Sequence, residues 1–217
     1  MKRRILLLSG GLDSAGALLK TLYTKKPDEV VRILHVDYIQ SALSKPQRVA
    51  VRELLLHVPD WDIYTCKTLD RVLHEPIDVC TKAMQAFGTG NFLEGDEKEE
   101  NATSLELIVG YEYEEFDTAT IDELNAAVQL VRSAFISVGV GILPTTVVSP
   151  VKDMDKGVIK EFIGDSTFWS CREPLLEWPN IYVPCGICHT CEQLHSHGIE
   201  HPSVKPDYST ILQKGGI

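Results

Sequence analysis

Short apolar runs alternate with segments of helical spacing along most of the chain, and this alternation restricts the fold more than any other feature. The run Arg4–Leu8 leads into helical spacing over Asp13–Tyr23, and the run Glu29–Asp37 leads into a segment that begins at Pro46. Strands that alternate with helices form parallel sheets with helices on both faces. We therefore predict an α/β fold. Further expected strands are Asp62–Thr65, Leu105–Gly110 and Thr145–Val148, and further expected helices are Ile121–Phe135 and Asp155–Ile163.

The composition changes near the end of the chain. From Thr167 onward Cys, Pro, Trp and His are frequent, which predicts a small irregular appendage. We expect an α/β domain over residues 1–166 and a C-terminal segment over residues 167–217 packed on it. Between two expected elements, Gly88–Ser104 is acidic and contains glycines, which indicates a solvated loop or a frayed helix.

Charge and hydropathy exclude several classes of protein. The 217 residues carry a formal net charge of −10, which argues against direct binding of nucleic acid, because phosphate contacts need a basic surface. No apolar run is long enough to span a membrane, and the apolar run after the first residues is too short for a signal peptide. We expect a cytoplasmic protein.

A polar turn with two glycines follows the first expected strand and opens the first expected helix. Its residues are Ser9, Gly10, Gly11, Leu12, Asp13 and Ser14. Backbone N–H groups at a helix N-terminus and the positive end of the helix dipole bind anions, typically phosphate. Glycine lets the backbone approach such a ligand, and the two serines can add hydroxyl donors. Asp13 is expected either to cap the helix or to hold a Mg²⁺ that bridges phosphates.

This turn lacks the Gly-Lys-Ser/Thr of the Walker loop and the Gly-x-Gly-x-x-Gly of dinucleotide-binding folds. It resembles the PP-loop, Ser-Gly-Gly-x-Asp-Ser, of the ATP pyrophosphatases, which split ATP between its α and β phosphates. That resemblance implies a Rossmann-like fold of the adenine-nucleotide α-hydrolase type, with ATP and Mg²⁺ bound at Ser9–Ser14. A capped turn without a ligand is the structural alternative.

Four of the six cysteines are crowded near the C-terminus, at Cys171, Cys185, Cys188 and Cys191. Four thiolates at short spacing are typical of a closed structural Zn²⁺ site. An iron–sulfur cluster, haem attached at Cys-x-x-Cys-His, and cysteines active in redox or sulfur transfer are the alternatives. The candidate substitute ligands are His189, His195, His197 and His201, which can equally be surface residues.

Together, the PP-loop and the cysteine motif resemble the 7-cyano-7-deazaguanine synthase family. The stretches His35–Gln40, Ser149–Lys156 and the two cysteine segments are similar to that family's sequence. The resemblance implies a ligase that converts 7-carboxy-7-deazaguanine and ammonia to the nitrile, using ATP, for queuosine or a related tRNA or DNA modification. It adds Tyr38 and Gln40 to the nucleotide-binding residues and gives Asp13 and Lys156 catalytic roles. We expect a deazapurine acid and ammonia as partners, no membrane partner, and a homodimer as one candidate assembly.

Several residues have both a functional and a purely structural interpretation. Lys156 can neutralise departing phosphates or be a solvated helix lysine, and Trp169 can contact substrate or pack in the core. Four acidic residues follow an expected strand, and one of them can hold a guanine-like edge, or all can belong to a solvated acidic loop; they are Glu112, Glu114, Glu115 and Asp117.

The chain also departs from the family. Gly88–Asn91 lacks an arginine that the family has, Leu194 stands where another is usual, and Lys45 and Arg48 are the remaining stand-ins. A tRNA-sulfurating or amidating PP-loop enzyme and a catalytically degenerate nucleotide-binding homologue therefore stay as alternatives.

Overall fold

The computed structural model describes residues 2–27, 29–56, 58, 63–68, 75–88, 102–112, 119–178 and 180–205. Its centre is a five-stranded sheet in the order β3-β2-β1-β4-β5, in which every neighbouring pair is parallel. The strands are β1 (Lys2–Leu7), β2 (Val31–Tyr38), β3 (Ile63–Thr68), β4 (Ser104–Ile108) and β5 (Thr145–Val148). The helices around it are α1 (Leu12–Thr24), α2 (Ser44–Leu55), α3 (Glu75–Phe87), α4 (Ala119–Ser137) and α5 (Lys156–Ile163).

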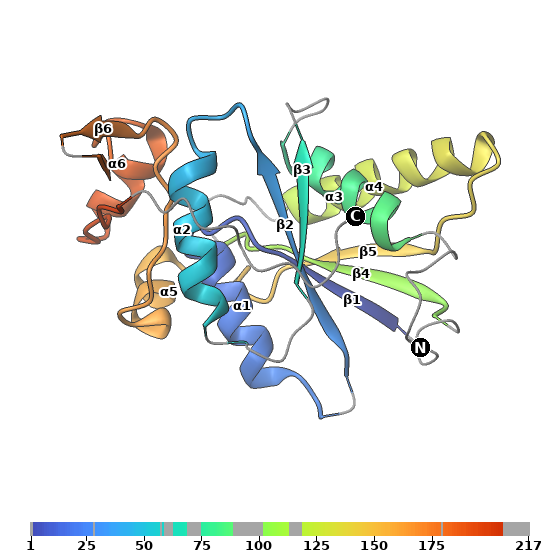
Figure 1. The fold of residues 1–217 in the computed structure, drawn as a ribbon. Helices are drawn as coiled ribbons and strands as arrows, with labels where there is room; N and C mark the ends of the chain where they lie inside the picture. Colours follow the sequence, from blue (N-terminus) through green and yellow to red (C-terminus); the bar gives the residue numbers. More distant parts are fainter. Residues whose placement is uncertain are drawn as a thin grey trace.

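The helices cover both faces of the sheet, as the sequence predicts (Figure 1). On one face, buried side chains of α1, α2 and α5 pack against Leu6, Leu8 and Ile33. On the other face, α3 and α4 bury theirs against Leu7 and Leu34. The central strands β1 and β2 therefore contribute alternate residues to two apolar cores, which is why Ile5–Leu8 and Val31–Val36 are rich in apolar residues. The edge strand β3 is more polar.

The strand order reverses between β1 and β4. The chain moves from β1 outward through β2 to β3, and then returns to the other side of β1 to form β4 and β5. The loops that leave β1 and β4 thus diverge at the carboxyl edge of the sheet. Such a switch point is where open α/β sheets bind their ligands.

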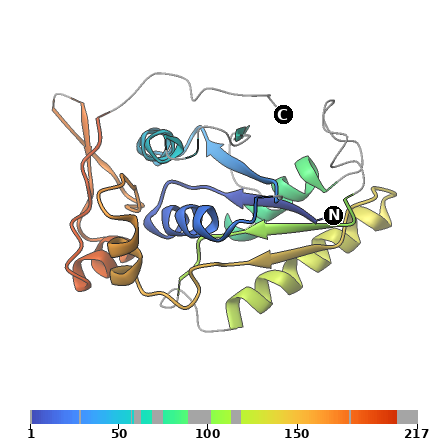
Figure 2. The ribbon, with the colours of Figure 1, turned by 90° about the horizontal axis from the view of Figure 1, so that it is seen from below.

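The C-terminal appendage contains more regular structure than the sequence predicts. It has a two-stranded antiparallel sheet of β6 (Leu175–Glu177) and β7 (Ile181–Val183), followed by helix α6 (His189–Ser196). Asn180 connects the strands with a φ of +83°, a conformation that asparagine tolerates better than most residues. Figures 1 and 2 show this appendage beside α2 and α5, at the end of the sheet to which the strand arrows point.

The predicted strands and helices that lie in the described residues are confirmed, with ends that differ by a few residues. The α3 helix was not predicted, although Cys80, Met84 and Phe87 are buried at helical spacing and Pro76 stands in its first turn. The expectation for Gly88–Ser104 falls mostly outside the described residues. Among the described residues, none of the helices has the length and apolar character that crossing a bilayer requires.

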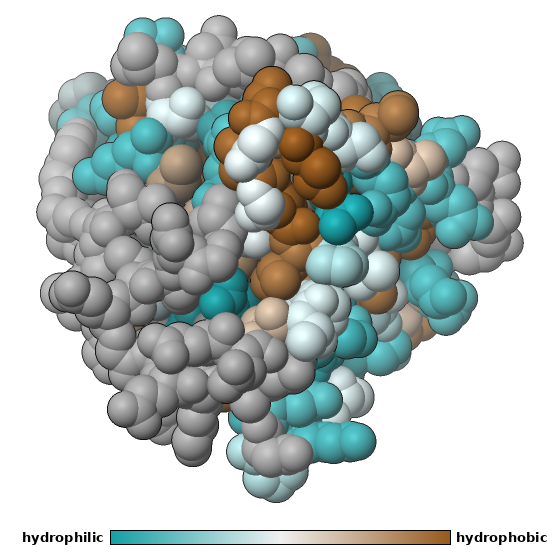
Figure 3. All heavy atoms as spheres, turned by 90° about the vertical axis from the view of Figure 1, so that its right-hand side faces the viewer, coloured by the Kyte–Doolittle hydropathy of each residue, from teal (hydrophilic) through white to brown (hydrophobic). Residues whose placement is uncertain are grey.

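Apolar side chains gather on the face that forms the right-hand side of Figure 1, where α4 ends (Figure 3). Exposed apolar residues of α4 and the turn after it are Leu130, Ile136, Val138 and Val140. This end of the sheet is opposite to the one that carries the appendage (Figure 1).

Candidate functional site

The loop Leu8–Gly11 leaves β1 at the switch point and enters α1 with Gly11 as the N-cap residue. Gly10 has a φ of +87°, and a Cβ there would lie 2.9 Å from the Gln47 carbonyl oxygen of α2. Only glycine combines this backbone conformation with so close an approach. Gly10 therefore lets the loop fit between the sheet and α2.

Hydroxyl groups tie the loop to the first turn of α1. The Ser9 hydroxyl donates to Ser14 Oγ at 3.0 Å and accepts the Gly11 N–H at 3.3 Å, and the Ser14 hydroxyl also lies 3.0 Å from the Gly11 carbonyl oxygen. Gly11 has no side chain with which to cap the helix. The acceptor for the Leu12 N–H comes from the appendage: the N–H donates to Oγ of Ser170 at 3.0 Å.

The loop after β4 closes the other side of the switch point. A Cβ on Gly110 would lie 2.3 Å from the Ser14 backbone nitrogen, so the two backbones are in direct contact. Two residues later Glu112 is completely buried. The other three acidic residues of the expected loop lie outside the described residues: Glu114, Glu115 and Asp117. The carboxyl edges of β1 and β4 are thus brought together at the first turn of α1.

A buried ion cluster lies at this junction. Lys156, the first residue of α5, has a side chain that is only 1% exposed. Its Nζ lies 3.0 Å from Glu112 Oε1 and 3.2 Å from Asp13 Oδ2. The solvated alternatives for Lys156 and Glu112 are therefore wrong, and the pairing of the two removes much of the cost of burying either charge.

Asp155 fixes the position of Lys156. Its carboxylate accepts the Val158 N–H at 2.8 Å and so caps the N-terminus of α5. On the other side, Gly16 of α1 lets Ile159 approach so closely that a Cβ would lie 2.7 Å from its Cγ2. The two helices therefore pack tightly, which carries the lysine toward Asp13.

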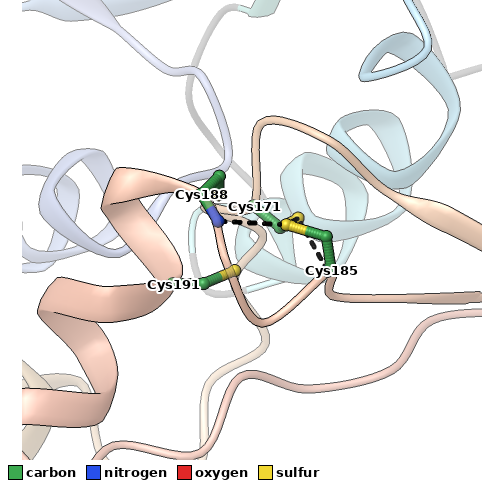
Figure 4. Close-up of side chains that lie close together, drawn as sticks. All are labelled: Cys171, Cys185, Cys188 and Cys191. Carbon is green, nitrogen blue, oxygen red and sulfur yellow. Dashed lines mark hydrogen bonds between the residues drawn. The ribbon is translucent and has the colours of Figure 1, made fainter.

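The four cysteines of the sequence motif converge, although the β6–β7 hairpin separates Cys171 from the other three in the sequence. Their sulfur atoms all lie within 4.8 Å of one another, a spacing that suits one tetrahedral metal ion. Figure 4 shows Cys185, Cys188 and Cys191 around one tight turn that leads into α6, with Cys171 approaching from a separate strand of chain. The cluster could hold a metal ion such as zinc.

Backbone N–H groups point at these sulfurs and favour thiolates. Cys185 N–H donates to Cys171 Sγ and Cys188 N–H donates to Cys185 Sγ, both at 3.3 Å. Burial of the Cys188 thiol raises its pKa, but hydrogen bonds from Arg172 and Cys191 outweigh this and lower the pKa to about 7. Burial instead raises the pKa of Cys171 and of Cys191, so a bound ion would displace their protons. Four sulfur donors at this spacing fit zinc.

In the described part of the chain, no histidine joins the cysteine cluster as a candidate metal ligand. His201 Nε2 accepts the N–H groups of Ser170 and Cys171, at 2.9 and 2.8 Å. Burial lowers the pKa of His201, and its Nδ1 lies 3.0 Å from the Pro202 carbonyl oxygen. A neutral ring that accepts at Nε2 and donates at Nδ1 satisfies all three contacts, so His201 orients the chain around Cys171.

Other residues suggested by sequence have structural contacts. Trp169 is buried, and its backbone N–H donates to the Gly10 carbonyl oxygen at 2.7 Å. The Tyr38 hydroxyl donates to Asp78 of α3, on the face of the sheet away from α1, while Gln40 is exposed in the turn after β2. Neither Tyr38 nor Gln40 is joined to Ser9–Ser14 by these contacts.

The stand-ins for missing arginines also have other surroundings. Arg48 Nε lies 3.7 Å from Asp37 Oδ2, and that aspartate accepts the Ser44 hydroxyl at 2.6 Å. Leu194 is buried in the core, where an arginine would be costly.

Sequence reasoning missed the roles of Ser149, Ser170 and His201. Ser149 follows β5 and accepts the Tyr111 N–H at 3.2 Å, which steadies the loop that carries Glu112. Ser170 directly precedes Cys171 of the cysteine cluster, and this position is the one sequence signal for its role. No family model matches the chain, and a comparison with curated proteins found no match either.

Proposed function

We propose that this protein is an ATP pyrophosphatase of the PP-loop type, which activates a carboxylate by transferring the adenylyl group of ATP to it. The observation that supports this most is the position of Ser9–Ser14. Ser9–Gly11 lie between β1 and α1 and Leu12–Ser14 form the first turn of α1, at the switch point and beside the buried cation of Lys156. Helix N-termini and lysines at such positions stabilise phosphate groups.

The charges around Lys156 assign different tasks to the two carboxylates. Two carboxylates and one ammonium leave a net negative charge, which a polyphosphate cannot approach without an added cation. Asp13 is 14% exposed and Glu112 is fully buried. We assign Asp13 to the Mg²⁺ that accompanies ATP and Glu112 to holding Lys156, which stabilises the departing pyrophosphate.

The reaction follows from attack on the α phosphorus. An oxygen of the substrate carboxylate bonds to that phosphorus, the bond to the bridging β oxygen breaks, and pyrophosphate leaves. Ammonia then adds to the activated carbon and displaces AMP, which gives an amide after loss of a proton. A second ATP activates the amide oxygen in the same way, and loss of AMP and protons gives a nitrile.

The substrate we propose is 7-carboxy-7-deazaguanine, with 7-cyano-7-deazaguanine as product. This rests on the resemblance of the PP-loop, His35–Gln40, Ser149–Lys156 and the cysteine segments to 7-cyano-7-deazaguanine synthases. We propose that the four cysteines bind a structural Zn²⁺. Gathering all four thiols into one cluster favours metal binding over sulfur transfer, which needs a free reactive thiol.

The test combines metal analysis with turnover. Zinc-loaded protein is incubated with ATP, Mg²⁺, ammonium and 7-carboxy-7-deazaguanine, and mass spectrometry follows AMP, amide and nitrile. We expect one zinc per chain and both products. Lys156→Met should abolish AMP formation, whereas the control Lys152→Met changes an exposed lysine of the preceding turn and should leave it intact.

Three outcomes separate the alternatives. AMP released with a different acid would keep the ATP pyrophosphatase assignment and replace the substrate. ATP binding without AMP formation or ATP–pyrophosphate exchange for any acid would indicate a degenerate nucleotide-binding protein. Absence of ATP binding would end the proposal.

A further inference from the structure

One short segment of the appendage joins the cysteine cluster directly to the loop at the start of α1. Its residues are Trp169, Ser170 and Cys171. The Trp169 N–H donates to the Gly10 carbonyl oxygen at 2.7 Å, and Ser170 Oγ accepts the Leu12 N–H at 3.0 Å. Cys171, the next residue, supplies one of the four clustered sulfurs.

The hydroxyl groups of Ser9 and Ser14 bind Gly11 and each other, whereas the Leu12 N–H donates to Ser170 of the appendage. The N-cap residue of α1 is glycine, and no side-chain cap comes from it. A helix N-terminus leaves backbone N–H groups that need acceptors, and loss of a capping hydroxyl frays the first turn. Ser170 takes this role although it lies 158 residues away in the sequence.

The segment itself is held from the side of the cysteine cluster. Cys171 Sγ accepts the Cys185 N–H, and His201 accepts the N–H groups of Ser170 and Cys171. The apolar support is small. Trp169 and Cys171 of the segment belong to a small buried cluster, whose other members are Val49, Ala50, Cys191 and Val204.

An ion bound to four sulfurs would join Cys171 to the turn at Cys185–Cys191 and so restrain the segment. Without it, the restraint depends on the hydrogen bonds to His201, on the weak hydrogen bonds to sulfur and on that small apolar cluster. Trp169 and Ser170 should then be held less firmly, and their two hydrogen bonds to the loop should weaken.

We propose that metal binding at the cysteine cluster organises the loop Leu8–Ser14, and that Ser170 is the positioning residue through which it acts. The effect on ATP rests on the proposed function, whereas the effect on the loop does not. Because coupling between two ligands is reciprocal, ATP should also tighten the hold on the metal.

Amide hydrogen exchange tests the coupling without any turnover. Zinc-loaded protein is compared with protein stripped of metal by a chelator under reducing conditions, and peptides covering residues 5–18 are followed. Loss of one hydrogen bond should speed exchange at Leu12 by about three- to tenfold. Peptides from α3, on the far face of the sheet, serve as the reference for general unfolding and should not change.

Two variants make the test specific to the Ser170 hydroxyl. With zinc bound, Ser170→Ala should speed exchange at Leu12 by a similar factor and raise the Kd for ATP about fivefold, with zinc content unchanged. Ser170→Thr keeps the hydroxyl and should restore both values. This rescue separates positioning from a general loss of stability.

The outcomes are distinct. Unchanged exchange at residues 8–14 after metal removal, while residues 171–191 exchange faster, would overturn the coupling whatever ATP does. If metal removal unfolds α3 as well, the zinc-loaded variants decide: equal exchange in Ser170→Ala and wild type rejects the proposal. Altered exchange with no ATP binding at all supports the coupling and contradicts the proposed function instead.

Discussion

A Gly110→Ala substitution tests the close contact between the loop after β4 and the first turn of α1. A Cβ at this position would lie 2.3 Å from the Ser14 nitrogen, 2.4 Å from Ser14 Cα and 2.5 Å from the Asp13 carbonyl carbon. These are backbone atoms, so no side chain can rotate away. Carbon atoms in contact prefer about 3.5–4.0 Å, so in Gly110→Ala the loop after β4 must retreat from α1 by about 1 Å.

The expected cost follows from overpacking. Inserting a methyl group into a packed interior costs about 1–3 kcal/mol, and a clash with backbone belongs at the upper end, about 3 kcal/mol. For a chain of this size that lowers Tm by about 6–12 °C. The same retreat moves Glu112 away from Lys156, so ATP use should fall further than stability alone explains.

Urea unfolding followed by circular dichroism gives the free energy of unfolding directly. Gly141→Ala is the matched control, since a Cβ there meets no atom within 4 Å. Should the two variants differ by less than about 0.5 kcal/mol, the direct contact of the two backbones would be wrong.

Three further predictions concern Lys156, the thiols and His35. Lys156→Met removes the cation between two carboxylates and should lower the free energy of unfolding by about 3 kcal/mol, against less than about 0.5 kcal/mol for the exposed Lys152→Met, both measured in urea. With zinc bound, a thiol reagent should label Cys66 slowly and Cys80 not at all, because burial raises the pKa of both thiols and takes that of Cys80 to about 12. Removal of the zinc by a strong chelator should add four labelled thiols, which mass spectrometry counts. Burial lowers the pKa of His35 below 6.5, although the Leu8 carbonyl and Asp37 oppose this, so only the unfolded chain takes up this proton as pH falls below about 6.5. Stability should then fall by up to about 1.4 kcal/mol per pH unit until the folded pKa is reached, and a His35→Gln variant with the same slope would contradict the assignment.

The sequence predicts the sheet well because its central strands β1 and β2 are buried on both faces and so contain apolar runs. It predicts the appendage poorly for the opposite reason. β6 is exposed along its whole length, so no alternation of apolar and polar residues marks it. Helix α3 did carry a signal, in the spacing of Cys80, Met84 and Phe87, and was missed.

The candidate site divides in the same way. The loop Ser9–Ser14 and the four cysteines are local patterns whose chemistry can be inferred from spacing alone. Glu112 acts through an ion pair with Lys156 of the fifth helix, which is in another part of the sequence. Ser170 acts through a hydrogen bond with Leu12 of the first helix, 158 positions earlier. These side chains reach the loop because β4 pairs with β1 and because the appendage packs at the same end of the sheet. Both arrangements are properties of the whole fold, so no single sequence segment predicts them.

The hydroxyl of Ser170 has a consequence for synthesis of the chain. Translation delivers the loop and α1 early, but the acceptor for the Leu12 N–H emerges from the ribosome 158 residues later. A nascent chain that has assembled its sheet should therefore hold a frayed first helical turn until the cysteine segment emerges. Ligand binding at this turn should then strengthen once Ser170 has emerged and folded against Leu12.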